Sequence, residues 1–179
     1  METRLKLAGH PIHPMLIVFP LGLFSAGFLF DVVYLLGRDA VFADVAFWTI
    51  TVGIVGGLLA AVFGLIDWVA IPKGTRAKRI GRFHGAGNVV IVLLFLTSWL
   101  LRLPRHAYAP DPLPFALVLI AVCGALVTAW LGGELVYRLR VSVDDDAGLD
   151  ASSSLAHDGI ISARRPTRTA DAPGSRSTS

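Results

Sequence analysis

The sequence predicts an all-α integral membrane protein, a four-helix transmembrane bundle with a disordered cytoplasmic C-terminal tail. Three observations predict this fold class. The 179-residue chain is 54% hydrophobic and 16% charged, with a mean hydropathy of +0.66, which is unusual for a soluble domain of this length. Its apolar residues form four long runs, and the composition turns polar abruptly after Val141. Lipid is therefore the expected solvent for the first 140 residues.

Each apolar run is about long enough to cross a bilayer. A span needs about 20 mostly apolar residues, because the rise is about 1.5 Å per residue and every backbone amide in hydrocarbon must be satisfied within the helix. The third run is the shortest and needs Gly85 to Asn88 to reach that length. We expect helices over about residues 14–36, 43–68, 84–102 and 114–138, within a transmembrane domain over residues 1–140.

The basic residues predict the orientation of these helices. Nine Lys and Arg lie near the helix ends on one face and three on the other. Because Lys and Arg resist translocation, both termini are expected in the cytoplasm. The basic rim would face anionic lipid, which explains the pI of 9.4 without a nucleic-acid partner. The two sets are Arg4, Lys6, Lys73, Arg76, Lys78, Arg79, Arg82, Arg138 and Arg140, against Arg38, Arg102 and Arg105.

The C-terminal residues 141–179 contain an aspartate run, a serine run and an end rich in Arg, Thr, Pro and Ser. Such a segment has too few apolar residues to offset the entropy lost on ordering, so a disordered polar tail is expected. A docking or phosphorylation segment is the alternative. No internal repeat of 20 to 50 residues is evident in the sequence.

Histidines and carboxylates gather at the predicted cytoplasmic ends of all four helices. Three imidazoles and two carboxylates at one depth form the donor set of a haem or transition-metal site. Ionisable groups at membrane depth are also functional candidates in general. The candidate ligands are His10, His13, Asp67, His84 and Glu134. Asn88 and Tyr137 are expected to orient these ligands without contacting the metal themselves.

Helical spacing predicts where some of these groups point. In the second helix a stripe of small residues lets a neighbouring helix approach closely, and Asp67 lies on that stripe. Asp67 should therefore face the bundle, although an ion pair with Lys73 or Arg76 explains it equally well. The stripe consists of Gly53, Gly57, Ala60 and Gly64.

Two further pairs have a structural alternative. His84 and Asn88 are four residues apart and share a helix face, so Asn88 either orients His84 or simply joins two helices. Glu134 lies beside Gly132 and Gly133, which favour close approach of another backbone or a ligand. A plain ion pair with Arg138, four residues on, is the alternative for Glu134.

The densest local motif is Gly9-His10-Pro11-Ile12-His13-Pro14. Each proline fixes its own φ and pushes the preceding histidine toward extended backbone, so both imidazoles are held stiffly. A preorganised ligand arm is one interpretation, and an ordinary helix start with Pro14 in the first turn is the other. Pro20 should kink the first helix and tilt this arm over the other helix ends.

These motifs, together with Gly133-Glu134-Leu135-Val136-Tyr137, resemble a bacterial membrane family catalogued as domain of unknown function 2231. The resemblance covers roughly residues 5 to 140. It implies a multi-pass protein of the bacterial inner (plasma) membrane and supplies no established activity. Some relatives are joined to c-type cytochrome modules, which implies a place near electron transfer, but this chain has no Cys-x-x-Cys-His motif.

Two functions therefore remain open. One is a membrane redox or metal-binding domain, in which His10 or His13 and His84 ligate haem b or another transition metal. A redox or other membrane-protein partner would go with it. The other is a non-catalytic membrane protein whose polar cluster fixes helix packing. A transporter is less favoured, because Asp31 is the only other ionisable residue well within a predicted span.

Overall fold

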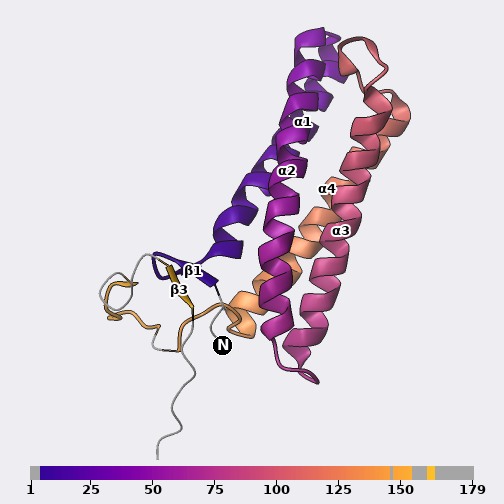
Figure 1. The fold of residues 1–179 in the computed structure, drawn as a ribbon. Helices are drawn as coiled ribbons and strands as arrows, with labels where there is room; N and C mark the ends of the chain where they lie inside the picture. Colours follow the sequence, from indigo (N-terminus) through magenta and orange to yellow (C-terminus); the bar gives the residue numbers. More distant parts are fainter. Residues whose placement is uncertain (1–4, 146, 155–160, 164–179) are drawn as a thin grey trace, which may run out of the picture.

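A computed structural model describes residues 5–145, 147–154 and 161–163, and four long helices dominate it (Figure 1). All four are long and apolar enough to cross a membrane, so the predicted fold class is confirmed. They are α1 (Ile12–Gly37), α2 (Ala40–Ala70), α3 (Arg76–Arg102) and α4 (Pro112–Gly133), and α4 continues into a π-helical turn, η2 (Glu134–Arg138).

The third helix begins at Arg76, well before the expected residue 84. Thr75 caps it, since the Thr75 hydroxyl accepts a hydrogen bond of 3.1 Å from the backbone N–H of Lys78. The first two turns of α3 are thus polar and basic, and the apolar run starts only above them. Hydropathy located the lipid-exposed part of this helix, whereas the cap determines where the helix starts.

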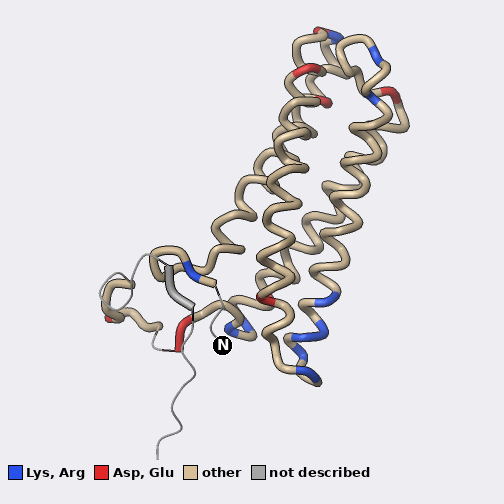
Figure 2. Tube along the Cα trace, viewed as in Figure 1, with Lys and Arg blue, Asp and Glu red and all other residues tan. Residues whose placement is uncertain are grey.

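The helices run up and down as two hairpins, α1–α2 and α3–α4, packed side by side (Figure 1). Helix α1 ends at Gly37, and the left-handed backbone of the capping residue Arg38 (φ 58°) lets the Arg38 N–H bond the carbonyl of Tyr34. A short 3-10 turn, η1 (His106–Tyr108), lies in the α3–α4 connection. Charged residues gather at the two ends of the bundle, and the tube between them is almost free of them (Figure 2).

A small antiparallel sheet flanks the end where α1 begins. It consists of β1 (Leu5–Leu7) between β2 (His10–Pro11) and β3 (Ile161–Ala163). An ion pair of 2.6 Å between Lys6 and Asp144 also ties the segment after α4 to the N-terminal segment. Part of the predicted tail therefore pairs with β1 through its backbone, while residues 146, 155–160 and 164–179 lie outside the described part.

The core lies in the centre of the bundle, where long side chains of the diagonally placed helices α1 and α3 meet. Phe24 and Phe95 stack there with ring centroids 3.9 Å apart. Ile50 of α2 and Val118 of α4 close the two sides of this stack and are fully buried. The middle of the bundle is thus an apolar core in which large side chains interdigitate.

The two hairpins repeat the same contacts around this central stack. Phe24 and Phe95 are 71 positions apart, as are Asp31 and Arg102, which form an ion pair nearer the α1–α2 turn. In the second helix of each hairpin, Ala60 and Thr128 are matched 68 positions apart. The bundle is therefore a parallel two-fold repeat. The sequence analysis found no internal repeat with a period of 20 to 50 residues, and the period of this repeat is longer than that.

Candidate functional site

His13 joins α1 to α2 through the small-residue stripe. Its Nδ1 lies 2.9 Å from the carbonyl oxygen of Ala60, and because a carbonyl only accepts, Nδ1 carries the proton. The ring rests on Gly64, where an added Cβ would lie 2.8 Å from the His13 Cε1. The stripe therefore admits the imidazole of α1, and the predicted close approach of a neighbouring helix is found here.

His84 joins α3 to α4 in the same way. Its Nδ1 donates to the carbonyl oxygen of Thr128 at 2.8 Å, and its ring rests on Gly132. The Asn88 amide nitrogen lies 3.1 Å from Nε2, and the Thr128 hydroxyl donates to the Asn88 Oδ1 at 3.0 Å. These bonds close a ring of three residues, which passes through the backbone carbonyl of Thr128 and uses both nitrogens of His84.

The two histidines occupy matched places in the repeat. Each donates Nδ1–H to a carbonyl of the next helix, and each lies over a glycine four residues after that carbonyl. The prediction that Asn88 bonds His84 agrees with this geometry. In both histidines Nε2 carries the lone pair. In His84 this lone pair accepts from the Asn88 amide.

The other predicted ligands lie apart from this pair. Glu134 accepts a hydrogen bond of 2.8 Å from Arg76 of α3, and not from Arg138, the partner considered as the alternative. The π-helical turn explains the difference, since residues four apart no longer align where the backbone bonds run from i to i+5. Glu134 thus ties the end of α4 to the start of α3.

His10, Asp67 and Tyr137 complete the predicted set. His10 lies in β2 and is exposed, so the extended arm carries it outside the bundle. Asp67 is half-buried near the end of α2 and has an interaction partner. Tyr137 is 85% exposed, which suits an interfacial anchor better than the predicted support of a ligand.

The predicted ligands therefore do not converge on one centre. Within residues 5–145, 147–154 and 161–163, no three His, Cys, Asp or Glu side chains are grouped so that they could hold a metal ion. Ligation by His84 would require Asn88 to turn away from Nε2. The arrangement instead joins neighbouring helices by four hydrogen bonds. They connect His13 with Ala60, His84 with Thr128, Asn88 with Thr128, and Glu134 with Arg76.

Sequence reasoning missed the most deeply buried polar contact. Asp31 and Arg102 are both 0% exposed and form a bidentate ion pair, with N–O distances of 2.7 and 2.6 Å. Ser98 supports Arg102 from the same helix and donates to the carbonyl of Pro114. Asp31 was noted as an isolated ionisable residue, but Arg102 was assigned to the outer loop. Their matched places in the repeat are the signal that could have joined them.

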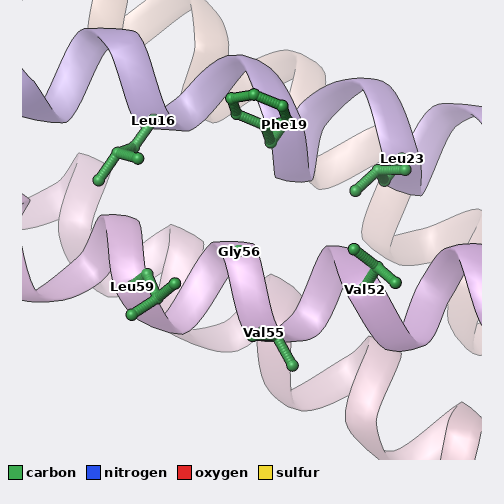
Figure 3. A pocket seen from close by; sticks show the side chains of 7 residues that line it. All are labelled: Leu16, Phe19, Leu23, Val52, Val55, Gly56 and Leu59. Carbon is green, nitrogen blue, oxygen red and sulfur yellow. The ribbon is translucent and has the colours of Figure 1, made fainter.

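A hollow on the surface between α1 and α2 is wholly apolar (Figure 3). It lies where buried Pro20 meets Gly56, at the level of the predicted kink. None of its lining side chains can ligate a metal or hydrogen-bond a cofactor. The lining residues are Leu16, Phe19, Leu23, Val52, Val55, Gly56 and Leu59.

Four apolar helices with charged ends and internally satisfied polar groups define an integral membrane protein. The chain belongs to the family described as "Predicted membrane protein (DUF2231)", whose model matches residues 9–145. No curated protein and no solved structure matches the chain. The resemblance expected from the short motifs is thus confirmed, and with it the membrane character of the chain.

Proposed function

We propose that this protein is a non-catalytic structural subunit of the membrane, in which polar side chains fix the register of two helical hairpins. One observation carries the proposal: three of the five predicted ligands are individually bonded to neighbouring helices. His13 bonds α2, His84 bonds α4, and Glu134 bonds α3. Interhelical hydrogen bonds of this kind hold membrane helices together at about 0.6 to 1.7 kcal/mol each.

The test is a visible absorption spectrum of the detergent-purified protein, oxidised and then dithionite-reduced, with elemental analysis of the same sample. The structural role predicts that the purified protein shows no α-band and contains no stoichiometric metal. The same result is expected when the protein is analysed within native membranes. It further predicts that His13→Gln and His84→Gln lower thermal stability. A reduced α-band that both substitutions abolish would refute the proposal.

A second candidate function is a haem or metal site on His13 and His84. It is favoured by the shared geometry of the two rings, since a histidine ligand commonly donates its other nitrogen to a backbone carbonyl. Asn88→Ala separates the two functions. Removing the Asn88 amide frees the Nε2 of His84 and should strengthen metal binding, whereas in the structural role it only destabilises the protein.

The proposed location is the inner membrane of a bacterium, with both termini in the cytoplasm. The charge difference between the two ends of the bundle supports this orientation (Figure 2). Single cysteines introduced by Arg38→Cys or Lys73→Cys, in a Cys123→Ala background, test it in intact cells. A membrane-impermeant maleimide should label only the first. Labelling of the second alone would reverse the orientation.

A further inference from the structure

The turn between α2 and α3 forms a basic hollow at the end of the bundle opposite the Asp31–Arg102 pair. Gly74 shapes the turn, because its φ of 80° is a left-handed conformation that favours glycine. The hollow is lined by Trp68, Gly74, Thr75, Lys78, Arg79 and Arg82. Blue segments mark this end of α3 in Figure 2.

Trp68 and Lys78 make one rigid wall of the hollow. The Trp68 indole donates to the carbonyl of Lys78 at 3.1 Å, and the Lys78 ammonium donates to the carbonyl of Trp68 at 2.6 Å. That ammonium lies 4.0 Å from the centre of the indole ring, which also packs on Gly81. Backbone carbonyls accept from the Lys78 ammonium, and in the described part of the chain no carboxylate pairs with it.

Arg79 and Arg82 provide the remaining charge. Both are exposed, and within the described residues neither forms an ion pair with a carboxylate. Arg76 differs from them, since it is paired with Glu134. Three cationic side chains therefore border the hollow without an acidic one, a composition that fits a phosphate group.

The neighbouring surface indicates that the phosphate belongs to a lipid. Phe83 is 58% exposed directly after Arg82, whose guanidinium lies 5.7 Å from the Phe83 ring. Above Phe83 the exposed face of α3 is apolar, with Val89, Val90 and Leu93. A free phosphate has no apolar part that could pack on such a surface, whereas the acyl chain of a lipid would lie along it.

We infer that this hollow binds the headgroup phosphate of an anionic phospholipid, with Arg79 and Arg82 as the phosphate ligands and Trp68 as the wall. Basic pockets at the ends of membrane helices bind anionic headgroups in this way, because each cation near the surface attracts the headgroup charge. The site is independent of the proposed structural role of the histidines.

The experiment measures retention of phosphatidylglycerol by the full-length protein in detergent, by native mass spectrometry, with phosphatidylcholine as the neutral reference. Arg79→Gln with Arg82→Gln should weaken phosphatidylglycerol binding by roughly tenfold or more. Arg79→Lys with Arg82→Lys, which keeps both charges, should retain most of it. The Gln variant should melt at the same temperature as wild type in phosphatidylcholine, since both side chains are exposed.

The matched control is Lys73→Gln with Arg138→Gln, which removes two exposed charges from the same end but outside the hollow. It should change binding by less than about twofold. Equal weakening by the two Gln variants would overturn the inference in favour of general attraction to an anionic surface. Competition by millimolar inorganic phosphate as effective as that by the lipid would overturn the lipid assignment.

Discussion

The two hairpins make the same helix–helix contacts at matched positions, but the side chains at those positions differ. In the first hairpin the matched positions hold Ile17 and Ala60, whereas the second holds Asn88 and Thr128, which complete the ring around His84. The first hairpin packs by small residues, and the second adds side-chain hydrogen bonds. A repeated backbone arrangement therefore does not require repeated side chains, and the second hairpin alone carries the polar ring.

The ion pair shows what this difference allows. Asp31 and Arg102 occupy matched positions and meet between the hairpins. Two identical hairpins would bring two like charges together at this point, which costs several kcal/mol. One chain that holds both hairpins can place opposite charges there. The pair is thus possible because the repeat is imperfect.

The largest expected effect comes from breaking the pair. Arg102→Leu should lower the free energy of unfolding by about 3–5 kcal/mol, because it leaves the Asp31 carboxylate buried and unpaired. Reversible unfolding in mixed micelles measures the loss. Exchanging the charges, Asp31→Arg with Arg102→Asp, should recover at least about half of it if the two positions are truly matched.

Arg105→Gln is the control at the same end of the bundle. Arg105 pairs with Asp111 in an exposed position, so its loss should cost no more than about 1 kcal/mol. An exchanged variant as unstable as Arg102→Leu would contradict the matched positions.

The next effect compares the glycines beneath the two histidines. Gly64→Ala should destabilise by about 1–3 kcal/mol, because the added Cβ would lie 2.8 Å from the His13 ring. Gly132→Ala should cost less, since the corresponding distance to His84 is 3.2 Å. Thermal unfolding of both variants measures the difference. Gly22→Ala is the control, because its Cβ meets nothing within 4 Å, and a cost there equal to that of Gly64→Ala would contradict the packing argument.

A smaller effect is expected from the polar ring that only the second hairpin has. Asn88→Leu and Thr128→Val should each cost about 0.6–1.7 kcal/mol, because each removes an interhelical hydrogen bond. The double variant should cost less than the sum, since both substitutions break the same bond. A double-mutant cycle in mixed micelles measures this coupling, and strict additivity would show that the two side chains act separately.

The smallest effect is expected at the exposed end of the second hairpin. Arg76→Gln should cost about 0–1 kcal/mol, because the Arg76 side chain is 52% exposed in its pair with Glu134. The cost should vanish in about 1 M salt, where the screening length is about 3 Å. Arg102→Leu should keep its effect in the same salt, because that pair is buried. Equal salt sensitivity would contradict this contrast.

The four helices could be predicted because hydrophobic length alone decides which segments can cross a bilayer. The contact of the stripe with a neighbouring helix and the bond between Asn88 and His84 followed from helical spacing. The convergence of His10, Asp67 and Glu134 on the two inner histidines could not be judged, because depth along the bundle does not determine direction around it. Two local features redirected these residues, the strand at His10 and the π-helical turn at Glu134.

The buried Asp31–Arg102 pair could not be predicted from the sequence for a related reason. Arg102 ends the apolar run of α3, so its charge alone indicates a loop residue at the bilayer edge. Only the docking of the two hairpins, through α2 with α3 and α1 with α4, brings Arg102 within reach of Asp31. Contacts between non-adjacent helices depend on how the hairpins dock, which the periodicity of a single helix does not specify.

The Asp31–Arg102 pair also has a consequence for biosynthesis. A ribosome adds about 5–20 residues per second, so Arg102 is polymerised on the order of 10 s after Asp31, which precedes it by 71 positions. During that interval α1 and α2 can already enter the bilayer, while the Asp31 carboxyl lacks its counter-ion. A charge at the centre of a membrane helix costs about 2.5–3.5 kcal/mol, and Asp31 costs less because it lies near the end of α1. The Asp31–Arg102 pair can therefore form only after both hairpins have been synthesised, so the first hairpin gains this contact later than its own α1–α2 contacts.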